Sequence, residues 1–154
     1  MRPAYQTEQD ELAEEVIATR LAKLWNCEML KFGGKFNAID RVAVRQEGKK
    51  HIVRAFAEIK KRTYSADDIA RMGTMMVGFD KIATAKAIAV AGGLPLFLIV
   101  CTSESDLWCA RVDNAPITEI VISGRIDRAD EADITLQALY DFSLFKKIGT
   151  LDKP

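Results

Sequence analysis

Three charged side chains, Asp40, Glu58 and Lys60, have the types and the spacing of a hydrolytic site. Glu58 and Lys60 close the run RAFAEIKKR, which has the composition of a buried strand. Because side chains alternate along a strand, residues two apart share one face. An acid and a base placed side by side can bind a cation and move a proton, or they can form an ion pair where a strand reaches solvent.

Asp40 is brought to the same pair by the hairpin that the sequence predicts. If residues 48–50 form the loop between two antiparallel strands, Asp40 stands opposite Glu58. Directly opposed residues have Cβ atoms about 4.5–5.5 Å apart, and like charges at that distance repel. A stable fold therefore needs a positive charge between the two acids. A divalent cation such as Mg²⁺ would supply it, and so would Lys60 alone.

Lys60 has two roles open to it in a metal site. It can position an attacking water and help it lose a proton, or it can remain protonated and stabilise the charge of a pentavalent phosphorane. The sequence does not choose between these roles.

The elements that must carry these side chains are marked by hydrophobic periodicity and turn residues. We predict a helix over about 8–25, with an apolar stripe formed by Leu12, Val16, Leu21 and Leu24. Glycine-rich segments separate three β-type runs over 27–32, 35–46 and 51–62, which predicts an antiparallel meander.

The rest of the chain predicts two helical segments and further strands. Ser65 and Asp68 form a capping-box pattern that opens a short helix. We expect a break near Gly78 and a second helix that is capped by Asp80 and ends at Ala91. Strands are predicted over 94–102, 107–113, 119–124 and 134–142, and the first of these is apolar on both faces, so we place it inside the sheet beside the third strand.

Composition restricts the class of protein. The chain has 154 residues, about half of them apolar, which fits one domain over 1–154. Net charge is zero, yet residues 31–62 contain ten basic and three acidic residues, a local excess of +7. Such a segment can bind phosphates or be a solvated surface.

The cysteines and the absence of targeting patterns predict the compartment. The three widely spaced cysteines predict reduced, buried thiols, and no segment has the composition of a signal peptide or membrane span. We therefore expect a cytoplasmic protein of a bacterial or phage-infected cell.

The order of these motifs resembles the PD-(D/E)XK, or restriction-endonuclease-like, nuclease superfamily. A helix carrying a glutamate precedes a strand with AID, a strand ending in AEIK, a helix and a further strand. Ile39 stands where the motif often has proline. The later stretches GRIDRADEADI and FSLFKKIG are similar to small phage and prophage members of the superfamily.

This resemblance implies a mixed α/β fold with an α-β-β-β-α-β core, a mixed central sheet flanked by helices, and additional C-terminal strands. It also implies that Asp40 and Glu58 bind Mg²⁺ or Mn²⁺ together with the Ile59 carbonyl, and that Lys60 lies beside the attacking water. The helix glutamate of related Holliday-junction resolvases best matches Glu15, with Glu11 as the rival. The expected phosphate contacts are the basic residues Lys31, Lys35, Lys49, Lys50, Lys61, Arg62 and Lys81.

The function expected from these features is a Mg²⁺-dependent deoxyribonuclease in phage or prophage DNA processing, with DNA as its partner and no membrane. Affinity would be modest or would come from a homodimer or another partner. Two alternatives stay open. One is a catalytically inactive member of the fold that serves as a nucleic-acid-binding or phage accessory protein. The other is an interaction module in which the three charged residues form only an ion-pair cluster.

Overall fold

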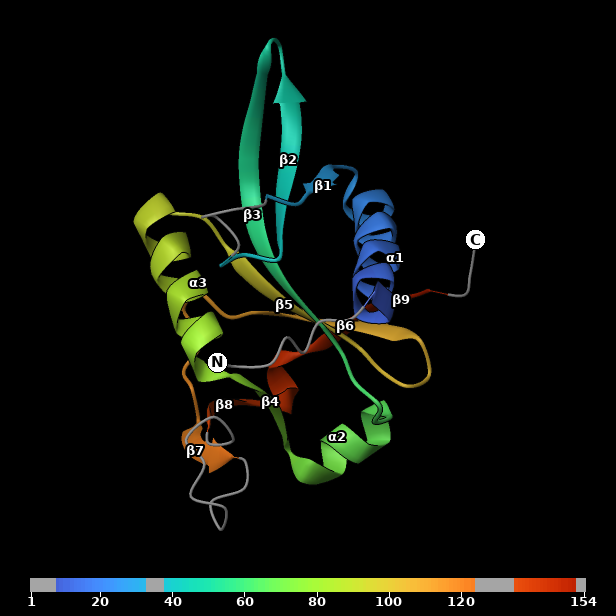
Figure 1. Cartoon of the computed structure of the whole chain (residues 1–154), viewed down its shortest axis with the longest axis vertical. Helices are drawn as coiled ribbons and strands as arrows, with labels where there is room; N and C mark the ends of the chain where they lie inside the picture. Colours follow the sequence, from blue (N-terminus) through green and yellow to red (C-terminus); the bar gives the residue numbers. More distant parts are fainter. Residues whose placement is uncertain (1–7, 33–37, 124–134, 152–154) are drawn as a thin grey trace.

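The computed structural model describes residues 8–32, 38–123 and 135–151 (Figure 1). In chain order, the elements are α1 (Glu8–Trp25), β1 (Glu28–Leu30), β2 (Arg41–Glu47), β3 (Lys50–Lys61), α2 (Ala66–Met72), β4 (Thr74–Gly78), α3 (Phe79–Gly92), β5 (Leu96–Cys101), β6 (Asp106–Arg111), β7 (Glu119–Ser123), β8 (Thr135–Asp141), a 3₁₀ turn (Phe142–Leu144) and β9 (Lys146–Thr150).

The central sheet has six strands in the order β1-β2-β3-β5-β6-β9. β3 and β5 run parallel, whereas every other neighbouring pair in this sheet is antiparallel. The fold is therefore mixed α/β, with the predicted meander β1–β3 and with β5 beside β3, as the sequence indicated. Leu98, Ile99 and Val100 in β5 are fully buried, which agrees with a strand that is apolar on both faces.

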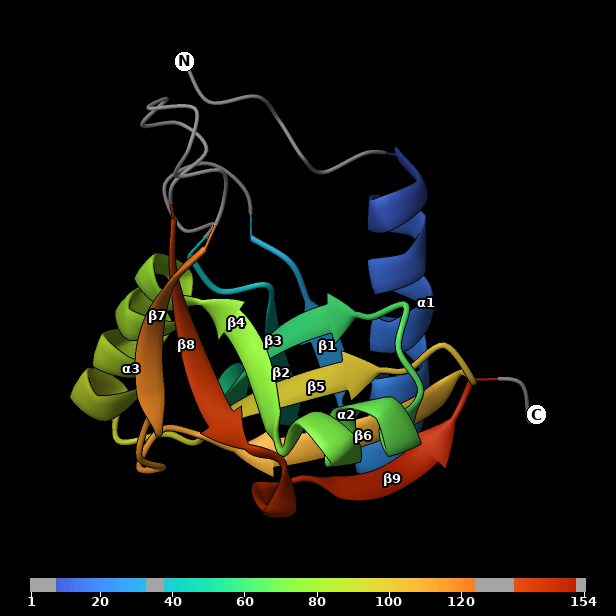
Figure 2. The ribbon, with the colours of Figure 1, turned by 90° about the horizontal axis from the view of Figure 1, so that it is seen from below.

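Helices cover both faces of this sheet (Figure 2). On one face, Ile17 and Leu21 of α1 pack against Ile59 and Leu107. On the other face lie α3 and a second sheet with the strand order β4-β8-β7. The polar end of β3 therefore emerges between α1 and α3, so each helix can contribute side chains to it.

The predicted helix over 8–25 is confirmed, but of the predicted apolar stripe only Leu21 is buried, and Leu24 is 36% exposed. Leu12 and Val16 are 66% and 54% exposed, while Ile17 and Leu21 are fully buried. Both sets have helical spacing, so periodicity alone could not distinguish them. The face of α1 that packs on the sheet contains Glu14, Ile17 and Leu21. The Glu14 carboxylate is therefore directed toward the end of β3.

The β2–β3 hairpin has the predicted register near Asp40 and Glu58, but its turn differs from the predicted one. Its turn has two residues, Gly48 and Lys49, rather than three, and Glu47 pairs with Lys50. This turn alone would shift the register by one. A β-bulge at Arg54 inserts one residue between the Val44–Val53 and Ala43–Ala55 pairs, which restores the register near the base of the hairpin.

Three expectations about the remaining elements were wrong or incomplete. β4 follows Gly73, where the sequence predicted no strand, and β9 was not predicted as a separate strand. Asp80 does not cap α3, because the helix begins at Phe79 with Gly78 at the N-cap, and Asp80 lies inside the first turn. The capping box of Ser65 and Asp68 is present at α2.

The cysteines are free thiols in the described residues, although only Cys101 is fully buried; Cys27 and Cys109 are partly exposed. Burial raises the pKa of Cys109 to about 12, so its thiolate is scarce at neutral pH. None of the helices in the described ranges is long and apolar enough to cross a membrane.

Candidate active site

Asp40 and Glu58 meet at the base of the hairpin. The Arg41–Ala57 pair is the last of the ladder, and one further step places Asp40 beside Glu58. The Asp40 backbone N–H donates to Glu58 Oε1 at 3.3 Å, and the Ile59 N–H donates to Asp40 Oδ2 at 2.9 Å. These two bonds hold each carboxylate against the backbone of the opposite chain segment. The two acids lie opposite each other, as the predicted hairpin register requires.

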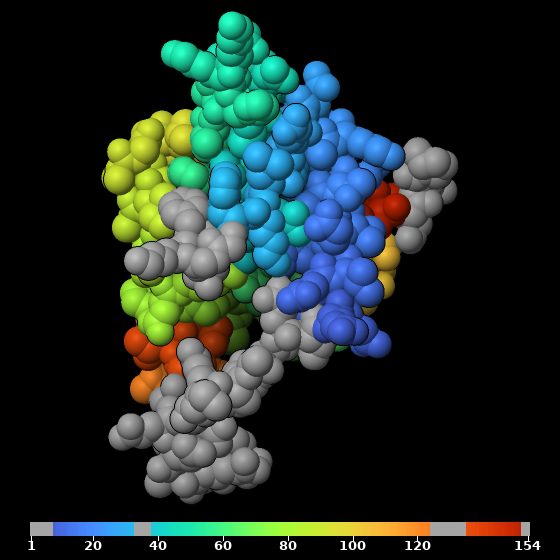
Figure 3. All heavy atoms as spheres, turned by 45° about the horizontal axis from the view of Figure 1, so that its top comes forward, coloured from blue at the N-terminus to red at the C-terminus, as the bar shows by residue number. Residues whose placement is uncertain are grey.

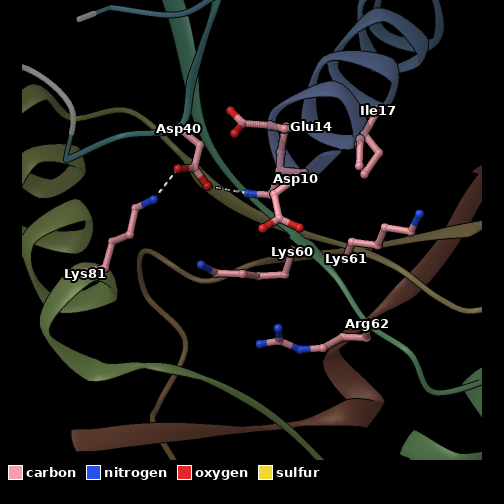
Figure 4. Close-up of a pocket in the computed structure, with 10 residues that line it drawn as sticks. Asp10, Glu14, Ile17, Asp40, Lys60, Lys61, Arg62 and Lys81 are labelled. Carbon is pink, nitrogen blue, oxygen red and sulfur yellow. Dashed lines mark hydrogen bonds and ion pairs between the residues drawn. The ribbon is translucent and has the colours of Figure 1, made fainter. Parts of the chain in front are cut away.

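The positive charge between the two acids comes from α3. Lys81 Nζ donates to Asp40 Oδ1 (Figure 4) and lies 3.5 Å from Glu58 Oε2. Lys81 occupies the first turn of α3, where the helix dipole disfavours a cation. Its ammonium is held there by the two carboxylates, whose side chains are only 10% and 1% exposed.

Two hollows adjoin this cluster on the surface. The first, the Lys60 hollow, has a volume of about 430 Å³ and is lined by Asp10, Glu14, Asp40, Lys60, Lys61, Arg62, Lys81 and apolar neighbours. Figure 4 shows Lys60 and Arg62 extending to one side of the β3 end and Lys61 to the other. The second, the Lys31 hollow, has a volume of about 470 Å³ and shares Glu14, Asp40 and Lys81 with the first. The carboxylate cluster is thus reachable from two sides.

The pKa values of the two acids are shifted in opposite directions. Burial and then repulsion by Asp40 raise the pKa of Glu58 to about 8, against the opposing effects of Lys81 and Lys60. Burial also acts on Asp40, but the charge and hydrogen bond of Lys81, with the Ile59 N–H, lower its pKa below the usual value. One acid is therefore ionised and the other protonated at neutral pH when no further cation is present.

Lys60 also has a shifted pKa. Burial and repulsion by Lys81 lower it from its usual value, and the attraction of Asp40 and Glu58 does not compensate. A lysine of this kind exchanges a proton more readily near neutral pH than an exposed lysine does.

The raised pKa of Glu58 predicts how stability depends on pH. The folded protein keeps this proton up to about pH 8, whereas the unfolded chain releases it near 4.5. The folded state binds more protons in this window, so wild-type stability should fall as pH rises from 5 to 8. In EDTA, Glu58→Gln should remove this loss, and its advantage over wild type should grow by about 1.4 kcal/mol per pH unit.

Urea unfolding at several pH values measures this difference. Glu119→Gln is the matched control, because Glu119 lies exposed on β7. Its curve should parallel that of wild type. Parallel curves for Glu58→Gln and wild type would show that Glu58 is not protonated in the fold.

Glu14, rather than Glu15, is the α1 glutamate at this cluster, and Asp10 of α1 also lines the Lys60 hollow. Glu14 is 8% exposed and lines both hollows. Arg41, itself buried, binds Glu14 Oε1 through Nε at 3.2 Å and Glu15 Oε2 through Nη2 at 2.8 Å. The Glu15 side chain is 64% exposed and lies outside the hollows. The signal that could have found Glu14 is its spacing of three, four and seven from Ile17, Ala18 and Leu21.

The predicted phosphate-binding residues divide into groups. Lys61, Arg62 and Lys81 line the Lys60 hollow. Lys31 lines the Lys31 hollow and lies 3.8 Å from Glu14. Lys49 and Lys50 are exposed at the tip of the hairpin, which projects from the rest of the molecule (Figure 3). Lys35 and the GRIDRADEADI stretch, residues 124–134, lie outside the described residues.

A mixed sheet with helices on both faces, and two opposed acids followed by a lysine on its third strand, define a restriction-endonuclease-like nuclease fold. The sequence matches the family described as "Phage putative PDDEXK endonuclease" over residues 1–148. The chain therefore belongs to this endonuclease family, which confirms the resemblance seen in its motifs.

Similar folds are found among solved structures. The Holliday junction resolvase Hjc of the archaeal hyperthermophile Archaeoglobus fulgidus is 15% identical, with a TM-score of 0.48, over 82% of this chain and 88% of that chain. A nuclease from a fusselovirus is also 15% identical, with a TM-score of 0.49, over 96% of this chain and 89% of that chain. No curated protein sequence matches this chain.

Proposed function

We propose that this protein is a Mg²⁺- or Mn²⁺-dependent deoxyribonuclease that hydrolyses phosphodiester bonds in phage or prophage DNA. The observation that carries the proposal is the pair of buried carboxylates, Asp40 and Glu58, which meet one cationic group beside a hollow that contains Lys60. Opposed carboxylates without a cation would destabilise the fold, so the cluster is built around a positive charge.

The residues present fit a divalent cation. The described ranges contain no group of three His, Cys, Asp or Glu side chains arranged for a metal. Mg²⁺ does not require one, because it usually binds through one or two carboxylates and completes its shell with waters and substrate phosphates. Asp40 and Glu58 already converge on the Lys81 ammonium, and the Ile59 carbonyl would be a further ligand by analogy with the family. Such a cation, when bound, supplies Lewis-acid stabilisation of charge on a phosphoryl group.

The other residues act on substrate and water. Lys60, in its hollow, holds the attacking water and takes part in proton transfer, which its lowered pKa favours. Glu14 faces the same hollow and is oriented by Arg41, so we assign to Glu14 the helix-glutamate role first expected of Glu15. Lys61 and Arg62 bind phosphates at the edge of the cluster, and Lys49 and Lys50 extend this contact along the hairpin.

The direct test is cleavage of linear, circular, branched and single-stranded DNA in Mg²⁺ or Mn²⁺, with EDTA and Asp40→Asn as inactive controls. Metal-dependent cleavage of at least one form is expected. DNA binding without cleavage of any form would instead favour the inactive accessory protein. Absence of both DNA and metal binding would favour the interaction module.

Lys81 provides a prediction that separates a metal site from an ion-pair cluster. Its ammonium contacts both carboxylates, so a metal ion must displace it. Lys81→Met should therefore raise Mn²⁺ affinity by about tenfold or more, because removal of about 1.4 kcal/mol of competing interaction has that effect. The same change should lower stability in EDTA, since it leaves two opposed acids without their partner.

Calorimetric titration above the pKa of Glu58, which is about 8, measures the affinity with both acids ionised. Lys23→Met is the control, because it removes the same charge from an exposed position on α1. This variant should bind Mn²⁺ as wild type does. If Lys81→Met only loses stability and gains no affinity, the lysine is a structural partner and does not compete with a metal.

A further inference from the structure

A third hollow, with a different lining, adjoins the Lys60 hollow at the end of β3. It has a volume of about 460 Å³ and shares Lys61 and Arg62 with the Lys60 hollow. Its remaining lining is mainly apolar and comes from α2, β4, β8 and the segment after β3, with Tyr64, Met72, Met76 and Leu139 among its residues. We call this the Tyr64 hollow. A molecule that occupies the Lys60 hollow can continue directly into it.

Three large apolar side chains that line the Tyr64 hollow are exposed. Tyr64, Met72 and Met76 are 47%, 57% and 42% exposed, although they come from three different segments. Large apolar side chains gathered around one concavity mark a binding site rather than scattered surface residues. Aromatic rings and thioethers both pack well against flat, polarisable groups.

Two hydrogen bonds join the segments that form the walls of this hollow. Arg62 Nη2 donates to the Met76 carbonyl at 2.7 Å, which joins the end of β3 to β4. The Ser103 N–H donates to the Tyr64 carbonyl at 2.8 Å. The ring of Tyr64 is thus carried on a fixed segment, so little ordering is required when a ligand binds.

The charges of the lining select the ligand. The described residues that line the Tyr64 hollow include two cations, Lys61 and Arg62, and no carboxylate. Both cations also line the Lys60 hollow. The matching ligand has an anionic backbone beside these cations and a flat, largely apolar group that projects from it. A nucleotide of a DNA strand has this shape and charge.

Distance limits the position of that nucleotide. Tyr64 follows Lys60 by four residues, and an extended chain of this length spans at most about 13–14 Å between the two Cα atoms. One DNA strand carries a phosphate about every 3.4 Å along a duplex axis, so the hollow lies within a few nucleotides of a phosphate at Lys60. Bases in a duplex are stacked and paired, and extraction of one costs several kcal/mol. The hollow is therefore best filled by a base that is already unpaired.

Resting on the proposed nuclease function, we propose that the Tyr64 hollow binds an unpaired nucleobase of a DNA strand whose phosphates lie along Lys60 to Arg62. The substrate class is then DNA with a single-stranded segment next to the cleaved bond, such as a branch, a flap or a frayed end. Tyr64 and Met76 supply the stacking surface, and Arg62 positions the adjoining phosphate.

The test compares binding of a single-stranded oligonucleotide and a blunt duplex of the same sequence, in EDTA so that neither is cleaved. Tyr64→Ala should weaken single-strand binding by about 5- to 150-fold, the usual worth of stacking one base on an aromatic side chain. Duplex affinity should change by less than about twofold, since paired bases do not reach the hollow. Tyr64→Trp should retain single-strand affinity because it keeps an aromatic face.

Further measurements keep this inference separate from the proposed function. Ile122→Ala, which shortens a 58% exposed side chain on β7, is the matched control and should leave both affinities unchanged. Fluorescence of 2-aminopurine in the single strand should fall on binding to wild type and not to Tyr64→Ala. If wild type cleaves DNA while Tyr64→Ala binds the single strand equally well, only this inference fails. If wild type binds neither DNA form, the proposed function fails too.

One outcome would assign the hollow to another occupant. If wild type sediments as a dimer and Tyr64→Ala as a monomer, with single-strand affinity unchanged, a second copy of the chain covers the apolar surface and the nucleobase proposal is wrong.

Discussion

Asp40→Asn is expected to abolish both metal binding and DNA cleavage. The change keeps the shape of the side chain and its place opposite Glu58, and it removes the carboxylate that is ionised at neutral pH. Glu58 is then the one remaining acid of the pair, and its burial disfavours the charged form, so it is a poor substitute for the lost carboxylate. Calorimetric titration of Mn²⁺ and a cleavage assay on the best DNA form measure the two losses.

Asp67→Asn is the control for this substitution. Asp67 lies exposed in the first turn of α2, outside both hollows at the cluster, so the variant should bind Mn²⁺ and cleave DNA as wild type does. Retention of metal-dependent cleavage by Asp40→Asn would remove the hairpin pair from the active site.

Lys60→Ala should separate catalysis from metal binding. Turnover should fall by about 10²–10⁴-fold, the usual contribution of one positioned acid–base group. Metal affinity should be retained or should rise, because a cation that repels the metal has been removed. Single-turnover cleavage at saturating DNA and calorimetric Mn²⁺ titration together give the separation.

Lys61→Ala is the informative contrast, because Lys61 is the next residue and extends to the other side of the β3 end (Figure 4). Its loss should raise the DNA concentration needed for half-maximal rate and leave saturated turnover nearly unchanged, as expected of a phosphate contact. If both variants reduce only DNA affinity, Lys60 acts as a phosphate contact and not as a catalytic group.

In an ion-pair cluster without catalytic function, these variants would behave differently. Lys60→Ala would lower stability, because it weakens the positive field around two buried acids, and Asp40→Asn would relieve their repulsion. Thermal melts with and without Mn²⁺ distinguish the two cases, since a ligand that binds only the folded state raises Tm.

Residue types and local spacing determined much of this protein. Two-residue periodicity put Glu58 and Lys60 on one face of β3, and the apolar β5 had to lie inside the sheet. The family of the chain followed from the same short motifs. These features depend on local backbone geometry and on the burial of continuous apolar runs, which sequence reports directly.

Only the tertiary structure decided which of several equivalent residues face the site. Leu12 and Val16 had the same helical spacing as the residues that α1 buries, so the choice of Glu14 over Glu15 came from contact with the sheet. The shorter turn shifts the β2–β3 register by one residue, and the bulge at Arg54 shifts it back by one. Lys81 lies 41 residues from Asp40 and reaches it because α3 packs beside β3. Contacts of this kind depend on how whole helices and strands pack against one another. The free energy of that packing is the sum of contributions from many side chains, and no single motif encodes it.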